Sequence, residues 1–159
     1  MENSGKIRYK FDKKSGGYVL VIASAINGGV EIPPVYNDGK NGEHPVVEIE
    51  NEAFALSDAK YVRIPESVVK ISTDALYAYV ALENIFVDEN NPVYKSVDGN
   101  LYSKDGKKII RYAKAKKNTS FDIPNGVVEI GDFAFFGSKN LVSVTIPESV
   151  TKIGEWAFA

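Results

Sequence analysis

Residues 146–158 read Ile-Pro-Glu-Ser-Val-Thr-Lys-Ile-Gly-Glu-Trp-Ala-Phe, and this pattern recurs along the chain. Each copy has an Ile-Pro pair, a second isoleucine seven residues after the first, and an Ala-Leu or Ala-Phe pair that ends five residues later. The copies begin at Ile64, Ile123 and Ile146, and residues 46–54 repeat the second half. The second isoleucines are Ile49, Ile71, Ile130 and Ile153. Matched apolar positions at intervals of 22 or 23 residues indicate a stacked repeat fold.

Each copy predicts the course of one coil of the chain. Val144 and Ile146 are two residues apart, so both face the same side of a strand. The proline that follows has no N–H and ends the strand ladder. Gly131 and Gly154 are expected at tight bends that need unusual backbone angles, and short helical or 3-10 turns then place Phe135 and Phe158 inside. One coil cannot bury such an apolar row alone, so the coils must stack.

A longer segment interrupts the repeat between Ile71 and Ile130. These residues are 59 positions apart, which equals two periods of 23 plus 13. Residues 100–103 and 108–112 flank Lys-Asp-Gly-Lys, and the Asp-Gly pair favours the tight turn of a β-hairpin. We therefore predict an inserted β-hairpin near residues 88–117 that projects from the stack.

The two ends of the chain differ from the repeats. Apolar and polar residues alternate over residues 7–11 and again over 18–22, with turn-forming residues 12–17 between them. We read residues 1–29 as a capping β-hairpin over one end of the stack. At the other end the sequence stops at Ala159, halfway through a coil, so an exposed apolar row and sheet edge are expected to favour self-association.

The pattern Ile-Pro-x-x-Val-x-x-Ile-x-x-x-Ala-Phe resembles the BspA-like, or treponemal-type, leucine-rich repeats over roughly residues 30–159. The stretch from Asp88 to Tyr102 is similar to the longer repeat variant of that family. The family often has cysteine shortly after the Ala-Phe pair, where this chain has Ser57, Tyr79 and Ser138. The predicted fold is mainly β, with short helical or 3-10 turns. It is a right-handed leucine-rich-repeat solenoid of about five coils over residues 30–159, with a parallel sheet and an incomplete last coil.

Composition and charge exclude several classes of protein. The chain has 159 residues, a mass of 17.4 kDa, 44% hydrophobic residues, a net charge of −2 and no cysteine. Disulfides and cysteine-based zinc sites are therefore excluded, and the overall charge gives no reason to expect nucleic acid. No apolar run reaches the roughly 20 residues of a membrane span. Residues 1–5 lack the basic start and apolar stretch of a signal peptide.

No residue pattern indicates catalysis or a bound cofactor. The single histidine, His44, has no evident catalytic partner or metal co-ligand in the sequence. Acidic residues such as Glu148 and Glu155 sit at repeated positions, which suits turns and caps better than an acid–base pair. Residues 88–91 are oxygen-rich but lack the glycine and distal glutamate of a calcium loop, which favours a turn. We expect a protein that is not an enzyme and holds no metal or cofactor.

Two surfaces are candidate binding sites. The first is the outward face of the predicted parallel sheet, because solenoids commonly bind there and because it carries aromatic and arginine side chains. Its residues are Tyr61, Arg63, Asn84, Phe86, Ser120, Asp122, Ser143 and Thr145. The second is a basic stretch that suits a polyanion or, in the interpretation we favour, a solvated hairpin whose lysines discourage sheet pairing. Its residues are Lys104, Lys107, Lys108, Arg111, Lys114, Lys116 and Lys117.

The family resemblance implies a bacterial cell-surface or secreted protein that adheres to host matrix, partner cells or glycans. The expected function is non-catalytic binding of a protein or glycan on the outward face of the sheet. The alternative is a structural spacer or a homotypic assembly module of a longer surface protein, in which the exposed last coil drives association. A fold alone does not fix a ligand, so its identity stays open at this point.

Overall fold

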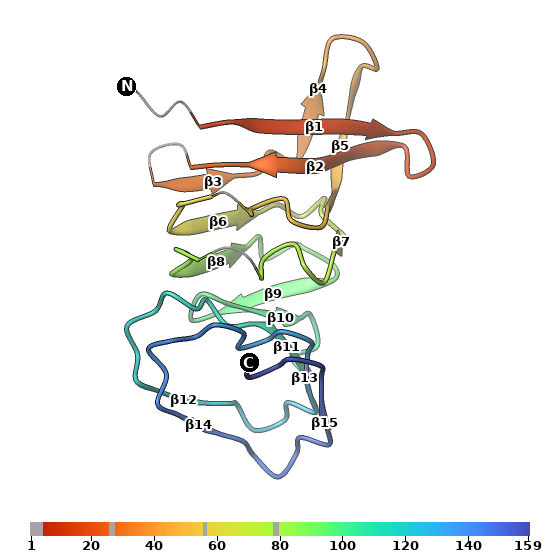
Figure 1. The fold of residues 1–159 in the computed structure, drawn as a ribbon. Coiled ribbons are helices and arrows are strands. Elements are labelled where there is room, and N and C mark those ends of the chain that lie inside the picture. The colour runs from red at the N-terminus through yellow and green to blue at the C-terminus, as the bar shows by residue number, and fades with distance from the viewer. Residues whose placement is uncertain (1–4, 26–27, 56, 78–79) are drawn as a thin grey trace.

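A computed structural model describes residues 5–25, 28–55, 57–77 and 80–159 (Figure 1). These residues form strands and turns and contain no helix. The expected short helical or 3-10 segments are hydrogen-bonded turns instead; the Ala134 N–H, for example, donates to the Gly131 carbonyl at 3.2 Å. The strands are β1 (Ile7–Asp12), β2 (Gly17–Ala23), β3 (Gly29–Glu31), β4 (Val35–Asn37), β5 (Glu43–Ile49), β6 (Tyr61–Ile64), β7 (Lys70–Ile71), β8 (Asn84–Val87), β9 (Tyr94–Val97), β10 (Asn100–Ser103), β11 (Lys108–Arg111), β12 (Ser120–Asp122), β13 (Glu129–Ile130), β14 (Ser143–Thr145) and β15 (Lys152–Ile153).

Successive coils stack through short parallel strands. β3, β6 and β8 form one parallel sheet, in which Val30, Val62 and Ile85 are aligned and fully buried. β12 and β14 pair in the same way farther along the chain. Each coil has a second short strand, and these strands also pair in parallel. β5 pairs with β7, and β13 pairs with both β11 and β15. The Ile-Pro repeat therefore does produce stacked coils, whereas their right-handed winding stays a prediction.

The inserted segment divides the expected parallel sheet in two. The Ile85 N–H on β8 donates to the Gly99 carbonyl at 2.8 Å, and the Val87 N–H donates to the Ser96 hydroxyl oxygen at 3.0 Å. These bonds occupy the edge of β8 that would otherwise pair with the next coil, so β8 and β12 lie in different sheets. Figure 1 shows the result: the coils with β3, β6 and β8 are seen edge-on, and those with β12 to β15 as open loops.

The inserted hairpin does not project from the stack, contrary to the sequence-based prediction. β10 and β11 pair antiparallel as expected, but β10 also pairs with β9, and β11 joins the ladder of β13. Leu101 and Ile109 are fully buried, because this segment supplies the inward row of one coil. The part that extends outward is the pair of β4 and the first half of β5, which rises past β1 in Figure 1.

β1 and β2 lie at the N-terminal end of the stack as an antiparallel pair. β2 also pairs in parallel with β5, so the pair continues the first coil. Tyr18 on β2 is fully buried, and its hydroxyl group donates to the Gly42 carbonyl at 2.8 Å. The pair thus occupies the position expected of a cap. The boundary between residues 29 and 30 stays a prediction.

Gly131 and Gly154 allow close approach of the coils rather than unusual backbone angles. Neither glycine has a positive φ; the left-handed conformation falls two residues later, at Phe133 (φ 56°) and Trp156 (φ 55°). A Cβ atom on Gly154 would lie 2.5 Å from the backbone nitrogen of Asp132 on the neighbouring coil. The prediction that these glycines need unusual backbone angles is therefore wrong. At Gly154 a side chain would separate the stacked turns, whereas at Gly131 a Cβ atom would make a tight contact of 3.1 Å with the Ile109 carbonyl oxygen.

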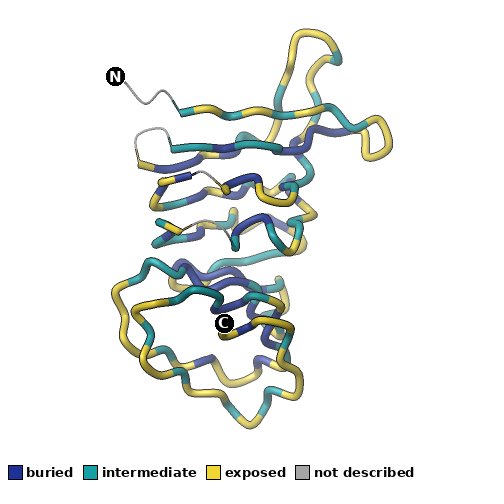
Figure 2. The backbone as a smooth tube through the Cα atoms, viewed as in Figure 1, coloured by how far each residue is buried: buried dark blue, intermediate teal, exposed yellow. Residues whose placement is uncertain are grey.

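Figure 2 shows buried residues along the inside of the coils, and they form two apolar clusters. The first extends from the N-terminal strands to Ala113, just after β11, and the second from β10 to the last coil. Phe54, Leu76 and Phe135, which occupy equivalent repeat positions, are buried as predicted. Phe158 was also predicted inside, but it is 45% exposed although it stacks on Phe135, and Ile153 is 53% exposed, so the apolar row of the last coil is uncovered.

Candidate functional site

The outward face of β3, β6 and β8 carries an acidic, a basic and an aromatic side chain in one row. Val30, Val62 and Ile85 point inward, so in each strand the next residue must point outward. The strand register then places Glu31 beside Arg63 and Arg63 beside Phe86. The sequence predicted Arg63 and Phe86 at this face, but it did not single out Glu31.

Arg63 is held in place by all of its neighbours on this face. The guanidinium carbon of Arg63 lies 4.6 Å from the centre of the Phe86 ring and 5.6 Å from that of the Tyr61 ring. Its Nε atom lies 3.5 Å from a Glu31 carboxylate oxygen, which also accepts a hydrogen bond of 3.3 Å from the Tyr61 hydroxyl. These contacts limit the rotamers of Arg63 while its side chain stays 56% exposed. We name Glu31, Tyr61, Arg63 and Phe86 the arginine cluster.

Gly29 determines the position of the Tyr61 ring. Gly29 and Tyr61 are aligned in the parallel register of β3 and β6. A Cβ atom on Gly29 would overlap the Tyr61 ring, so the ring lies directly over the glycine. Sequence reasoning missed Gly29 as a part of this site. The signal that could have found it is the match between residues 30–33, Val-Glu-Ile-Pro, and residues 62–65, Val-Arg-Ile-Pro, which aligns Gly29 with Tyr61.

A shallow groove adjoins the arginine cluster. Its volume is about 320 Å³, and Arg63 and Phe86 form part of its wall. Three acidic residues also line it: Glu31, Glu66 and Asp88. The remaining lining is Ile32, Pro34, Ile64, Pro65 and Val87. The groove therefore combines an apolar floor with more carboxylates than cations, a surface that suits a ligand with positive groups.

The structure does not bring the eight predicted sheet residues together. Ser120 aligns with Ser143, and Asp122 with Thr145, in the separate pair of β12 and β14. All four of these residues are exposed, as predicted. Asn84 is only partly exposed, and its side-chain oxygen accepts a hydrogen bond of 3.3 Å from Lys116. The arginine cluster is thus the part of the predicted face that forms a connected group.

The seven basic residues also do not form one surface. Arg111 is only 4% exposed, Lys108 pairs with Glu129 at 2.9 Å, and Lys114 donates to the Tyr77 carbonyl at 2.6 Å. Lys104 and Lys107 precede β11, whereas Lys114, Lys116 and Lys117 follow it. Polyanion binding by this stretch stays a prediction.

The residues considered for catalysis or metal binding have structural partners. The His44 Nε2 atom lies 3.1 Å from the Asn41 carbonyl oxygen, and the ring packs 4.8 Å from that of Phe11. Residues 88–91 form a turn in which the Asn90 N–H donates to the Asp88 carboxylate at 2.9 Å. Within the described residues there is no group of three or more metal-ligating side chains and no helix long and apolar enough to cross a membrane.

The chain belongs to the BspA-type leucine-rich repeat family. Residues 41–104 and 107–159 match the BspA type leucine rich repeat region, with six copies. The resemblance drawn from the Ile-Pro repeats is therefore confirmed. Among the positions compared with the family cysteine, Ser57 and Ser138 are described, whereas Tyr79 lies outside the described residues.

Solved structures of bacterial leucine-rich repeat proteins share this fold. One from Eubacterium ventriosum is 33% identical with a TM-score of 0.71, over 82% of this chain and 32% of that protein. A leucine rich cell surface protein from Faecalibacterium prausnitzii is 21% identical with a TM-score of 0.58, over 100% of this chain and 45% of that protein. The chain thus spans less than half the length of either protein. No match was found among curated proteins.

Proposed function

We propose that this chain is a non-catalytic binding module of a bacterial cell-surface or secreted protein, and that it recognises a protein ligand at the arginine cluster. The observation that carries the proposal is Arg63, which is exposed and yet fixed between two aromatic rings and a carboxylate. Arginine and aromatic side chains dominate the energetics of protein interfaces. Family membership supports the binding role, and the F. prausnitzii neighbour, described as a cell surface protein, supports the location.

The geometry of the arginine cluster favours tight binding because its side chains lose little conformational entropy when a ligand binds. An arginine whose rotamers are already limited by its neighbours forfeits less side-chain entropy when a ligand covers it. Phe86 is 36% exposed and offers a flat apolar contact beside the guanidinium. The adjoining groove adds the carboxylates of Glu66 and Asp88, so the matching protein surface presents an apolar or aromatic group to Phe86 and a lysine or arginine to the groove.

The test is a binding screen on immobilised matrix proteins and glycans. It compares the wild-type chain, an Arg63→Ala/Phe86→Ala variant and a Ser143→Ala/Thr145→Ala control on the separate β12–β14 sheet. Loss of two anchor residues at an interface costs about 2 kcal/mol or more, which corresponds to a dissociation constant about thirtyfold higher. The control is expected to bind as the wild type does. Equal binding by all three proteins would contradict the proposal.

Two other outcomes of the screen would relocate the function. Binding to glycans alone, lost in the Arg63→Ala/Phe86→Ala variant, would keep the site but replace the protein ligand by a carbohydrate. Binding that survives this variant and disappears at high salt would point to the basic stretch, because screening weakens exposed charge contacts. Lys104→Ala/Lys107→Ala is the variant that tests that site.

The exposed side chains of the last coil favour a second function, assembly through self-association. Val142 is 87% exposed and Trp156 is 64% exposed. A cavity of about 690 Å³ opens there between Leu141, Ile146 and Phe158. Contiguous exposed apolar surface is a common mark of protein contact. Sedimentation of the wild type beside a Val142→Ser/Trp156→Ser variant tests this role; a concentration-independent monomer for the wild type would exclude it.

A further inference from the structure

A small cleft lies between the parallel pair of β5 and β7 and the parallel pair of β11 and β13. β7 pairs with β5, and β11 pairs with β13, but β7 and β11 do not pair with each other. A cleft of about 190 Å³ opens between them, roughly six times the volume that one water molecule takes up in the liquid. Its lining comes from both sides of the break: Ile71, Ser72, Thr73, Leu76, Tyr94, Leu101, Lys108, Ile110, Arg111, Gly131 and Asp132.

Arg111 brings a buried positive charge to this cleft. The residue is 4% exposed, and two of its guanidinium nitrogens donate to the backbone carbonyls of Phe133 and Thr73. Its Nε atom is buried and has no hydrogen-bond partner. No carboxylate of the described residues lies within 4.0 Å of the guanidinium. A guanidinium has five N–H donors, so unused donors remain at a charge that carbonyls alone do not neutralise.

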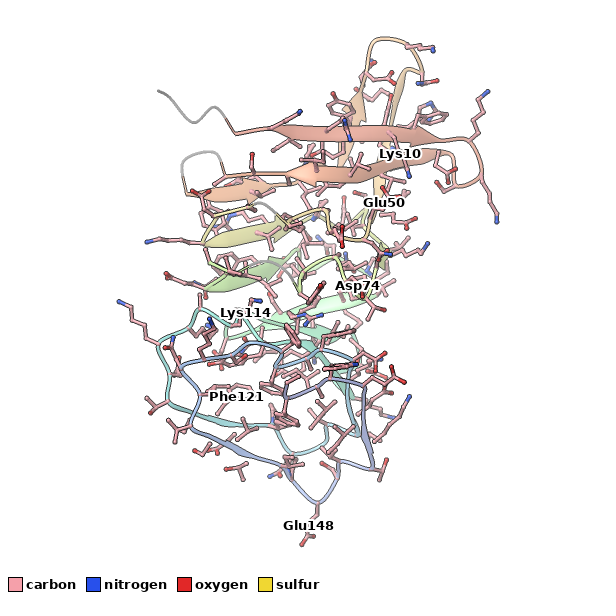
Figure 3. The ribbon with its side chains drawn as sticks, in the orientation of Figure 1. Lys10, Glu50, Asp74, Lys114, Phe121 and Glu148 are labelled. Carbon is pink, nitrogen blue, oxygen red and sulfur yellow. The ribbon has the colours of Figure 1, made fainter. Side chains whose placement is uncertain are left out.

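Burial also lowers the pKa of Arg111 to about 10, with a smaller opposing effect of the Asp74 charge. The side chain is therefore still cationic at neutral pH. Figure 3 shows Asp74 and Lys114 near this junction between the upper and lower coils. A buried cation with no carboxylate in direct contact is costly, whereas an anion that accepts its free N–H groups offsets that cost.

Other residues that line the cleft carry hydroxyl donors. The Tyr94 hydroxyl oxygen accepts the Ile71 N–H at 3.0 Å, which leaves the hydroxyl proton for another acceptor. Ser72 and Thr73, each of which carries a hydroxyl group, belong to the same lining. These neutral donors and one arginine match the two oxygens of a carboxylate, which an arginine fork binds through two parallel hydrogen bonds.

The charges at the rim limit the charge of the ligand. Lys108 lines the cleft but pairs with Glu129 at 2.9 Å, and Asp132 adds a carboxylate that accepts the Glu155 N–H at 2.8 Å. Repulsion by Asp132 penalises a dianion such as phosphate more than a monoanion. We propose that the cleft between β7 and β11 binds a small carboxylate group through Arg111 and the Tyr94 hydroxyl. The carboxylate comes either from a simple organic acid or from an acidic sugar.

NMR titration of the arginine Nε–H signals tests this proposal on the wild-type chain. The sequence contains three arginines, Arg8, Arg63 and Arg111, so Arg8→Lys and Arg63→Lys variants assign the Arg111 signal by elimination. The probes are acetate and glucuronate, with sodium chloride at matched ionic strength and uncharged glucose as controls. We expect a saturable shift of the Arg111 signal with a carboxylate and none with chloride or glucose.

The two carboxylates distinguish the sources of the ligand. Saturation by acetate and glucuronate at similar concentrations supports recognition of a simple carboxylate. Saturation by glucuronate at a concentration at least tenfold lower supports an acidic sugar. An Arg111 signal that stays unchanged with both acids up to 100-fold excess overturns the proposal and leaves Arg111 as a link between the coils. A Ser72→Ala variant, which retains Arg111, is expected to weaken binding two- to fivefold.

Discussion

Asn91 supports a sharp prediction because its buried side chain holds two coils together. It is fully buried, and its amide nitrogen donates to the carbonyls of Pro65 and Val68 at 2.9 and 2.8 Å. Its amide oxygen accepts the N–H groups of Val93 and Tyr94 at 2.9 and 2.8 Å. One side chain thus satisfies four backbone groups, two on the preceding coil and two at the start of the insertion.

Replacement of Asn91 by alanine removes a partner from each of these four backbone groups, and only the Pro65 carbonyl is seen to keep another, the Val68 N–H at 3.4 Å. A buried group that loses its partner costs about 1–3 kcal/mol, and some of the four will be hydrated, so we expect a loss of about 3–5 kcal/mol in the free energy of unfolding. Urea denaturation measures this loss. With a slope of about 2 kcal/mol per molar, the midpoint falls by about 1.5–2.5 M.

The matched control is Asn90→Ala. Asn90 is exposed, and its hydrogen bond to Asp88 uses the backbone N–H, which alanine retains. Its effect is expected to stay within about 0.5 kcal/mol. If Asn91→Ala also lies within that range, the reasoning that one amide holds the two coils together is refuted.

Three further changes probe other parts of the account. Gly29→Ala displaces the Tyr61 ring, so binding at the arginine cluster should weaken severalfold while circular dichroism keeps the wild-type strand signal; unchanged affinity would refute this. Gly154→Ala forces the last coil away from Asp132, and we expect an unfolding free energy lower by about 1–3 kcal/mol in thermal melts, with no loss as the contrary result. Burial raises the pKa of Tyr102 from its ordinary 10.0 to about 12, helped by the Asp98 charge. The Tyr102 hydroxyl therefore keeps its proton to a higher pH in the folded state than in the unfolded state. The stability that the protonated hydroxyl gives to the fold is complete below pH 10 and disappears as the pH rises to about 12. Stability curves of Tyr102→Phe should be flatter than the wild type in that range, and parallel curves would contradict the assignment.

The stacking of the coils could be predicted from the sequence because each position of the repeat shows by itself whether its side chain is buried. Ile130 and Phe135 fall at fixed offsets from Ile123, and all three are buried. The alternation along β6 likewise placed Arg63 outside and Val62 inside. Such local rules depend on the period of the strand and on burial, and both can be read from one copy of the pattern.

What the sequence did not predict depends on contacts between distant segments. The division of the parallel sheet arises because Gly99 and Ser96 take the N–H groups of β8, and no periodicity indicates that pairing. Arg111 was assigned to an exposed basic stretch, yet the ladder between β11 and β13 directs it inward. Glu31 and Gly29 complete the candidate site only once the register of β3 and β6 is known.

Hydrogen exchange of the chain with and without a captured ligand tests the central claim most directly. Added protection is expected to be concentrated in residues 29–31, 61–64 and 84–87, which carry the arginine cluster and its sheet. The Arg63→Ala/Phe86→Ala variant should lose that protection. Protection confined to residues 141–159, with none on β3, β6 and β8, would contradict the claim and assign the contact to the last coil.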